Sequence, residues 1–418
     1  MPLKKKPVNG MKDILPAEKE IRDYVTEVIL RTYRSYGFTP IETPCMEDIG
    51  NLSNKQGGEN EKLIFKILKR GEKLHLDAAK TENDVVDYGM RYDLTVPLSR
   101  FYANHSNDLP TPFKAIQIGQ VWRADRPQRG RYRQFTQCDI DIIGDPTNLA
   151  EIELILATTT TLGRLGFHHF EIRINERRIL KAMALYAGFA EDDFDAVFII
   201  LDKMDKIGLD GVRGELLASG FEPSAINKYL QLFDELSGKR SVKDGVAYLA
   251  DVLAGFLTQE VTMSLLEIAE TVTAAKEADF ELVFDPTLVR GMSYYTGTIF
   301  EVAIPEFGGS CGGGGRYDEM VGRFAGRDVP ACGFSIGFER IILLLMESGF
   351  TIPLSPAKRV YLIEKGYPAE KLAKVMSQAR EDRQNGKQVL IVRMNKNKKF
   401  QKENLRKEGY EDFVEFFK

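Results

Sequence analysis

The chain has 418 residues, of which 43% are hydrophobic and 28% are charged, and its formal net charge is −4. This length predicts two or three domains, and the near-neutral charge excludes a uniformly basic surface, so any contact with nucleic acid must come from a local basic patch. The four cysteines lie far apart without a CxxC pair, and no segment approaches the roughly 20 apolar residues of a membrane span, so we expect a cytoplasmic protein without disulfides.

The first elements in the chain are predicted as a helix and several strands. Apolar residues from Ile21 to Ile29 recur at helical spacing, and this helix is expected to end near Tyr36, before Gly37. Residues 37–47 predict an edge strand, because their two prolines suit a strand end. Residues 62–77 predict a hairpin that turns at Lys69 to Glu72.

The next stretch is predicted to contain two strands, a helix and a further strand. Residues 113–144 hold two apolar runs separated by a loop rich in arginine. Asp145 before Pro146 predicts the start of a helix, because aspartate caps helices and proline is tolerated in the first turn. Residues 169–176 alternate like a strand, and 177–275 are rich in helix formers.

The last third of the chain is predicted to return to strands and to end in a small α/β domain. The glycine tract at 308–315 lies between strand-like segments, so close backbone approach is favoured over a flexible linker. After a linker at 351–356, strands and helices alternate, which indicates parallel pairing.

Two clusters of basic residues predict contacts with phosphate. Five arginines in the loop before the second apolar run suit an anionic ligand, because a guanidinium donates two parallel hydrogen bonds; the alternative is a solvated hairpin. These are Arg123, Arg126, Arg129, Arg131 and Arg133. A second patch near 395–408 includes Lys398, Lys399 and Lys402, and it either binds RNA phosphates or is a solvated helix face.

Six blocks of sequence, in order, resemble the motifs of class II histidyl-tRNA synthetases. They are GFTPIETP (37–44), MRYDLTVPLSRF (90–101), VWRADRPQRGRYRQFTQCDIDIIG (121–144), LVRGMSYYTGTIFEV (288–302), GGGGRYDEMVGRF (312–324) and CGFSIGFERI (332–341). The resemblance implies an α+β fold, with an antiparallel sheet flanked by helices, and a homodimer. It also implies a catalytic domain in two parts (1–176 and 276–350), a helical insertion (177–275), a linker (351–356) and a shortened anticodon-binding-like α/β domain (357–418).

The same resemblance assigns roles to individual residues. Arg123, Arg131 and Arg340 match positions that bind ATP, and Arg123 matches the contact to its α-phosphate. Asp93, Thr95, Gln137 and Asp141 match positions that receive the α-amino group of histidine. Tyr294 and Tyr295 match the pair near the imidazole. Magnesium is expected with ATP, and its ligands are not assigned.

Arg290 matches the arginine that the family uses at the reacting centre. Where the family most often has an aspartate, this chain has Ser293, which predicts tuned or slightly weakened activity. The expected reaction joins histidine to ATP and then transfers it to the terminal ribose of tRNA(His). One alternative is a histidine-binding paralogue that charges no tRNA, such as the regulatory subunit of ATP phosphoribosyltransferase, and the shortened C-terminal domain is the feature in its favour. Another is a paralogue that activates an amino acid but loads it onto something other than tRNA.

Overall fold

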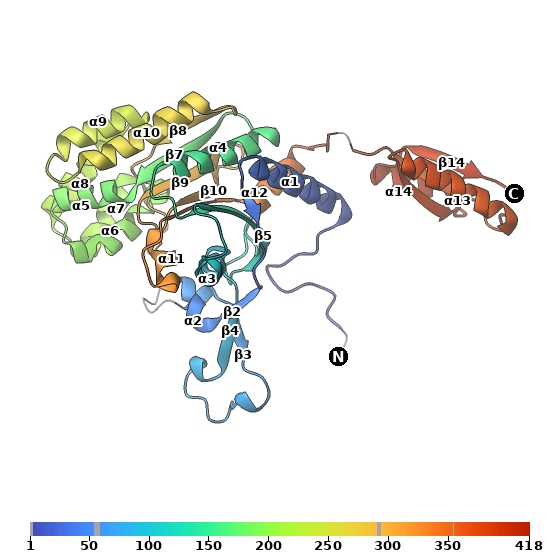
Figure 1. Cartoon of the computed structure of the whole chain (residues 1–418), viewed down its shortest axis with the longest axis horizontal. Helices are drawn as coiled ribbons and strands as arrows, with labels where there is room; N and C mark the ends of the chain where they lie inside the picture. Colours follow the sequence, from blue (N-terminus) through green and yellow to red (C-terminus); the bar gives the residue numbers. More distant parts are fainter. Residues whose placement is uncertain (1–2, 54–58, 291–293, 354) are drawn as a thin grey trace. The chain divides into compact units, whose positions relative to one another are not determined.

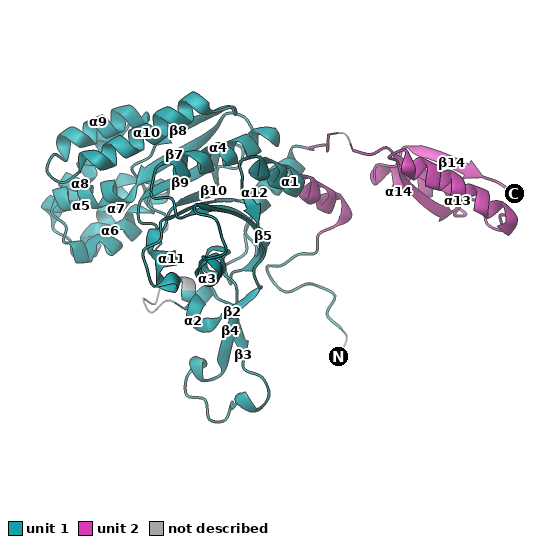
Figure 2. Cartoon of the chain, in the orientation of Figure 1, with its two compact units in different colours: residues 1–13, 25–348 teal, residues 14–24, 349–418 magenta. Residues whose placement is uncertain are grey.

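The computed structural model describes residues 3–53, 59–290, 294–353 and 355–418. The chain divides into two compact units (Figure 2). One contains residues 25–348 together with the first 13, and the other contains residues 14–24 and 349–418. None of the helices within the described ranges is long and apolar enough to cross a membrane.

A large mixed sheet is the centre of the first unit (Figure 1). The spatial order of its described strands is β1-β5-β6-β11-β10-β9-β7-β8. Their bounds are β1 Thr39–Pro40, β5 Phe113–Trp122, β6 Gln134–Ile143, β7 Phe170–Glu176, β8 Phe280–Phe284, β9 Thr298–Ile304, β10 Gly309–Arg316 and β11 Ala331–Ile336. The inner strands pair antiparallel, and only the edge pairs β1–β5 and β7–β8 of this described sheet are parallel. This arrangement confirms the predicted α+β class.

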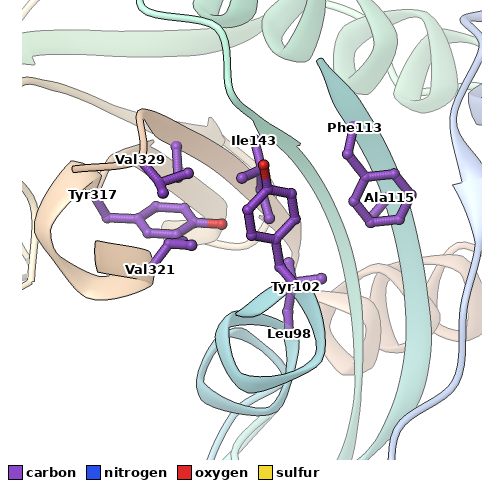
Figure 3. Packing of buried hydrophobic residues seen from close by; sticks show 9 residues of the cluster. Leu98, Tyr102, Phe113, Ala115, Ile143, Tyr317, Val321 and Val329 are labelled. Atoms are coloured by element: carbon purple, nitrogen blue, oxygen red, sulfur yellow. The ribbon is translucent and has the colours of Figure 1, made fainter. Parts of the chain in front are cut away.

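Helices cover both faces of the sheet. α4 (Leu149–Arg164) and α12 (Phe338–Glu347) pack against its middle strands, and α3 (Thr95–His105) packs against α11 (Asp318–Ala325). Figure 3 shows the core formed where α3 and α11 meet β5 and β6. Leu98 and Tyr102 of α3 belong to this core, and so does Tyr317, the residue immediately before α11. Full burial of such apolar and aromatic side chains contributes roughly 1.5–3 kcal/mol each, so the core fixes both helices over the sheet.

Residues 177–275 fold into helices, as the sequence predicts. They are α5 (Arg177–Ala187), α6 (Phe194–Leu201), α7 (Met204–Ala218), α8 (Pro223–Leu236), α9 (Val242–Val252) and α10 (Gln259–Ala275). On α8, buried residues such as Ile226, Tyr229, Leu230 and Phe233 recur every three or four positions, which is the spacing of one helix face. This segment therefore has an apolar core of its own.

Near the N-terminus, α1 (Pro16–Ser35) ends before Gly37, whose φ of 82° only glycine adopts without strain, and this end was predicted. Within the predicted segment 37–47, the edge strand is confirmed only for Thr39–Pro40, which form β1 at one edge of the sheet.

The predictions of a hairpin at 62–77 and of a helix start at Asp145 are wrong. Residues 69–77, all of them described, contain no strand; β3 (Lys66–Leu68) pairs instead with β4 (Val86–Met90), which also pairs with β2 (Met46–Asp48). Asp145 does not cap a helix: its side chain accepts the backbone N–H of Thr147 at 2.8 Å, and α4 begins at Leu149. In both places a local turn satisfies the backbone before the next element starts.

The glycine tract forms β10, an inner strand of the sheet, so the predicted close backbone approach is confirmed. A Cβ atom added at Gly314 would lie 2.0 Å from the carbonyl oxygen of Gly333 on β11. Glycine is thus the residue that lets the two strands approach each other here.

We expect Gly314→Ala to lower the free energy of unfolding by about 1–3 kcal/mol or more, because backbone atoms must shift to admit the methyl group. Chemical denaturation measures this change. Gly309→Ala is the matched control on the same strand, since its Cβ would meet nothing closer than 3.7 Å. Equal stability of the two variants would contradict the steric explanation.

The second unit contains a small parallel sheet, as predicted. β12 (Lys358–Ile363) lies between β13 (Gln388–Arg393) and β14 (Asp412–Phe416), and both pairings are parallel. The helices α13 (Ala369–Gln384) and α14 (Lys398–Lys407) connect the strands. Tyr361 and Leu362, adjacent on β12, are both fully buried. The middle strand is therefore covered on both faces, which is typical of parallel sheets.

Candidate active site

Polar residues alternate along β6 and point to one face of the sheet. Gln137, Asp139 and Asp141 are two positions apart, and side chains at that spacing share a face. In the neighbouring strand β11, Ser335 lies opposite Asp139, and Gly333 lies opposite Asp141. A Cβ atom at Gly333 would lie 2.0 Å from Asp141 Oδ1. The glycine therefore leaves the space that the carboxylate occupies.

Asp141 is a buried carboxyl group with one oxygen left for a ligand. The hydroxyl of Tyr317 donates to Oδ1 at 2.5 Å. Oδ2 is buried and has no hydrogen-bond partner among the described residues. Burial raises the pKa of Asp141 to about 7, although the bond from Tyr317 opposes the shift. Such an oxygen is suited to accept a hydrogen bond from a cationic ligand.

Asp93 brings a further carboxylate to the same place from the start of α3. Its Oδ1 accepts the backbone N–H of Val96 at 3.0 Å. Desolvation raises the pKa of Asp93, and the charge of Asp93 in turn raises the pKa of both Asp139 and Asp141. Carboxylates that disfavour one another's ionisation in this way create a site that favours a bound cation.

Gln137 faces the same carboxylates. Its amide Nε2 lies 3.4 Å from Asp139 Oδ2 and from Ser335 Oγ, and its buried Oε1 lacks a hydrogen-bond partner in the described part of the chain. This oxygen is therefore a second acceptor for a ligand.

The tyrosine pair closes the carboxylate cluster on one side. The rings of Tyr294 and Tyr295 lie 4.9 Å apart at 86°, and Tyr294 lies 5.6 Å from Tyr317. A side-chain hydrogen bond joins Tyr294 to Thr95, and burial raises the pKa of both tyrosines, so both stay neutral. The structure thus brings together all six residues predicted to bind histidine.

Arg123 reaches this cluster from the end of β5. Its guanidinium lies 4.2 Å from the ring centre of Tyr92 and 5.2 Å from that of Phe135, and its Nε donates to the carbonyl of Tyr92 at 3.0 Å. Its charge lowers the pKa of Asp93. Because aromatic rings hold this arginine in one orientation, it can present a fixed positive charge to an anion beside the carboxylates.

Three further arginines that the sequence predicts at the site are Arg340, Arg290 and Arg131. Arg340, in the first turn of α12, stacks 5.3 Å from the ring of Phe307 and donates to the carbonyl of Ser310. Burial lowers the pKa of Arg340, and the charges of Arg290 and Arg131 lower it further. Arg131 also forms an ion pair with Asp125 at 3.0 Å. Arginines that repel one another in this way would be stabilised by a bound polyanion.

Arg290 forms an ion pair with the buried Glu301 of β9. Its predicted neighbour Ser293 lies outside the described residues, so the expectation about that position stays a prediction. Sequence reasoning missed Glu301 and gave no role to Tyr317. The signal was present in both cases, as a single acid within the apolar strand TIFEVAI and as the tyrosine of GGGGRYD.

The basic patch in the second unit is partly neutralised. Lys398 and Lys402 both form ion pairs with Glu415 of β14, whereas Lys399 is exposed. Two of the three lysines predicted to bind RNA therefore have partners within their own unit.

Comparison with known proteins identifies the fold first. A crystal structure of histidyl-tRNA synthetase from Nostoc sp. PCC 7120 superposes with a TM-score of 0.79 at 28% identity, covering 98% of this chain and 90% of that one. A Bacillus halodurans structure, titled as an ATP phosphoribosyltransferase regulatory subunit/histidyl-tRNA synthetase, has a TM-score of 0.77 over 99% of both chains; at 21% identity it shows the fold alone. The fold is thus that of class II aminoacyl-tRNA synthetases.

The sequence comparisons define the family. The family model described as histidyl-tRNA synthetase matches residues 10–341. A histidine--tRNA ligase of Leifsonia xyli is 48% identical over 347 residues, or 81% of this chain and 80% of that protein. One from Christiangramia forsetii is 38% identical over 85% of this chain and 80% of that protein. The chain belongs to the histidyl-tRNA synthetase family.

Proposed function

We propose that this chain activates histidine with ATP and transfers it to tRNA(His). The observation that carries the proposal is that the site combines an acidic, aromatic side with a basic side. Desolvated carboxylates and tyrosines on one side suit an ammonium and an imidazole, and three converging arginines on the other suit a triphosphate. Family membership supports the same pairing.

In the first step, a carboxylate oxygen of histidine attacks the α-phosphorus of ATP. A bond forms between them, and the bond to the bridging oxygen breaks, so that histidyl-adenylate and pyrophosphate result. The attacking carboxylate is already ionised and needs no general base. Magnesium enters this proposal as part of the ATP substrate, where it would screen the charge of the triphosphate.

The residues of the site act by binding the charged groups of histidine and ATP in fixed positions. Asp93, Gln137 and Asp141 orient the ammonium, so that the carboxylate is held toward the arginines. Arg123 contacts the α-phosphate, while Arg131 and Arg340 hold the rest of the nucleotide. Arg290 stabilises the negative charge that grows on the phosphoryl oxygens in the transition state.

In the second step, a hydroxyl of the terminal ribose of tRNA(His) attacks the carbonyl carbon of the adenylate. An ester bond forms, the bond from that carbon to the phosphate oxygen breaks, and AMP leaves together with the proton of the hydroxyl. A charging assay with tRNA(His) tests this step, and histidine-dependent pyrophosphate exchange tests the first. Exchange without charging would indicate another acceptor. Binding of histidine without exchange would support the non-charging paralogue, which the arginines Arg123, Arg290 and Arg340 argue against.

We propose a cytoplasmic homodimer with the domain division implied by the motifs. Exposed apolar side chains support the dimer: Met46 on β2 and Tyr88 on the neighbouring strand β4 are 53% and 47% exposed. Size measurement in solution tests it, and a monomer would contradict it.

Lys399→Ala is expected to weaken tRNA binding and to reduce the slope of log K against log salt by about one, because one phosphate contact is lost. Lys374→Ala, an exposed lysine on α13 of the same unit, is the control. Binding isotherms at several salt concentrations measure both variants. An unchanged slope for Lys399→Ala would remove the patch from the tRNA-binding surface.

A further inference from the structure

A buried carboxylate holds the arginine at the proposed reacting centre. Glu301 lies in the middle of β9, and its side chain is 7% exposed, whereas that of Arg290 is 56% exposed. Burying a carboxylate in an apolar strand is unfavourable unless a cation or donors compensate for the lost water. β9 therefore carries a buried carboxylate that is unfavourable on its own, and Arg290 forms an ion pair with it.

The groups around Glu301 connect it to the other arginines. Ser310 of β10 lies near this carboxylate and lowers its pKa, and the backbone carbonyl of Ser310 accepts a hydrogen bond from Arg340. Arg290 and Arg340 are thus held by adjacent groups on two paired strands. A shift of the Glu301 side chain would disturb the position of Arg290 directly.

Arg173 is the other cation near Glu301, and it lies opposite on β7. Its ion pairs are to Glu171 at 3.6 Å, Asp285 at 3.5 Å and Asp205 at 4.0 Å, so it acts on Glu301 only at longer range. Asp285 and Arg173 oppose one another in their effect on Glu301. A purely structural pairing of Glu301 with Arg173 is therefore less favoured than a role toward Arg290.

We infer that Glu301 is a positioning residue that fixes the guanidinium of Arg290 over the α-phosphate without itself touching a substrate. This inference rests on the proposed function. A mostly exposed arginine has up to about 2 kcal/mol of side-chain conformational entropy to lose. An anchor formed in the free enzyme meets that cost before the reaction, so the cation does not have to be ordered in the transition state.

The test is a double-mutant cycle on Glu301 and Arg290. Glu301→Gln is expected to lower the rate of histidyl-adenylate formation by roughly 10- to 100-fold with little change in the KM for histidine, since a small misplacement of a catalytic group costs that much. In an Arg290→Ala background the same substitution should have almost no further effect, because the group that it positions is gone. Glu301→Asp keeps the charge, and it should lose less activity than Glu301→Gln.

The control is Glu171→Gln, which removes a carboxylate of the adjacent strand that pairs with Arg173 and Arg240. It should leave the rate unchanged, and thermal melting of each variant identifies loss of fold. The inference would be overturned if the losses of rate caused by Glu301→Gln and Arg290→Ala multiplied in the double mutant, or if Glu301→Gln kept full activity. Either result would leave the proposed function intact. Absence of exchange in the unmodified protein would overturn both.

Discussion

Arg290→Ala is expected to slow histidyl-adenylate formation by roughly 10²- to 10³-fold, while the affinity for histidine changes little. The size follows from the loss of one fixed donor to a developing oxyanion. The effect falls on the rate because the guanidinium meets the negative charge chiefly in the transition state. The carboxylates and tyrosines that receive the amino acid lie elsewhere in the site and remain in place.

Single-turnover measurement of adenylate formation, together with equilibrium binding of histidine, separates these two effects. Arg240→Ala is the matched control, since Arg240 is also 56% exposed and also pairs with a glutamate, Glu171. Wild-type rates for Arg290→Ala would assign Arg290 a structural role. A loss confined to histidine binding would place it in the amino-acid subsite instead.

Asp141→Asn is expected to weaken histidine binding and to stabilise the fold at pH 8. Loss of a charge-assisted hydrogen bond costs about 1.5–3 kcal/mol, which raises the KM for histidine by roughly 10- to 100-fold. The neutral amide keeps an oxygen that can accept the bond from Tyr317. It also removes a buried charge from beside Asp93 and Asp139, whose own ionisation becomes easier.

The pH dependence follows from the raised pKa of Asp141. The folded state, with a pKa of about 7, retains a proton that the unfolded state, with an ordinary pKa, has released. Stability from this group is therefore full below pH 4 and is lost as pH rises towards and through 7. The advantage of Asp141→Asn in melting temperature should be large at pH 8 and small near pH 4.

Melting curves of both proteins between pH 4 and pH 8 measure this difference. Asp251→Asn, at an exposed carboxylate of α9, is the control. A constant difference in melting temperature across that range would show that ionisation of Asp141 is not the cause. An unchanged KM for histidine would remove Asp141 from the binding site.

The helical segment and the parallel C-terminal sheet could be predicted from local sequence, because the abundance of helix formers and the alternation of strand-like and helical stretches are local features. The α+β class was implied by the resemblance of the ordered motifs. Partners distant in sequence were not predictable in this way. The run before Lys69 forms the strand β3, but its partner residues on β4 are at least 18 positions away, and no local pattern indicates that pairing. Aspartate is a residue type that caps helices, yet the side chain of Asp145 closes a turn that lies before the start of α4.

The site shows the same division. Motif order was enough to predict that Asp93, Gln137, Asp141 and the tyrosines serve one ligand, and the structure brings them together. It was not enough to predict how Arg290 is held. Glu301 lies eleven positions further along the chain, on β9, and only the structure shows that it is buried and forms an ion pair with Arg290. At position 293, three residues from Arg290, this chain has serine where the family most often has aspartate, and the carboxylate that pairs with Arg290 comes from β9 instead.

Histidine-dependent exchange of pyrophosphate into ATP tests the central claim most directly. We expect exchange with saturating ATP, magnesium and histidine, none without histidine, and none when histidinol, which lacks the attacking carboxylate, replaces it. Arg290→Ala should reduce the exchange rate by the same factor as adenylate formation. Absence of exchange from a folded protein that binds histidine would contradict the account.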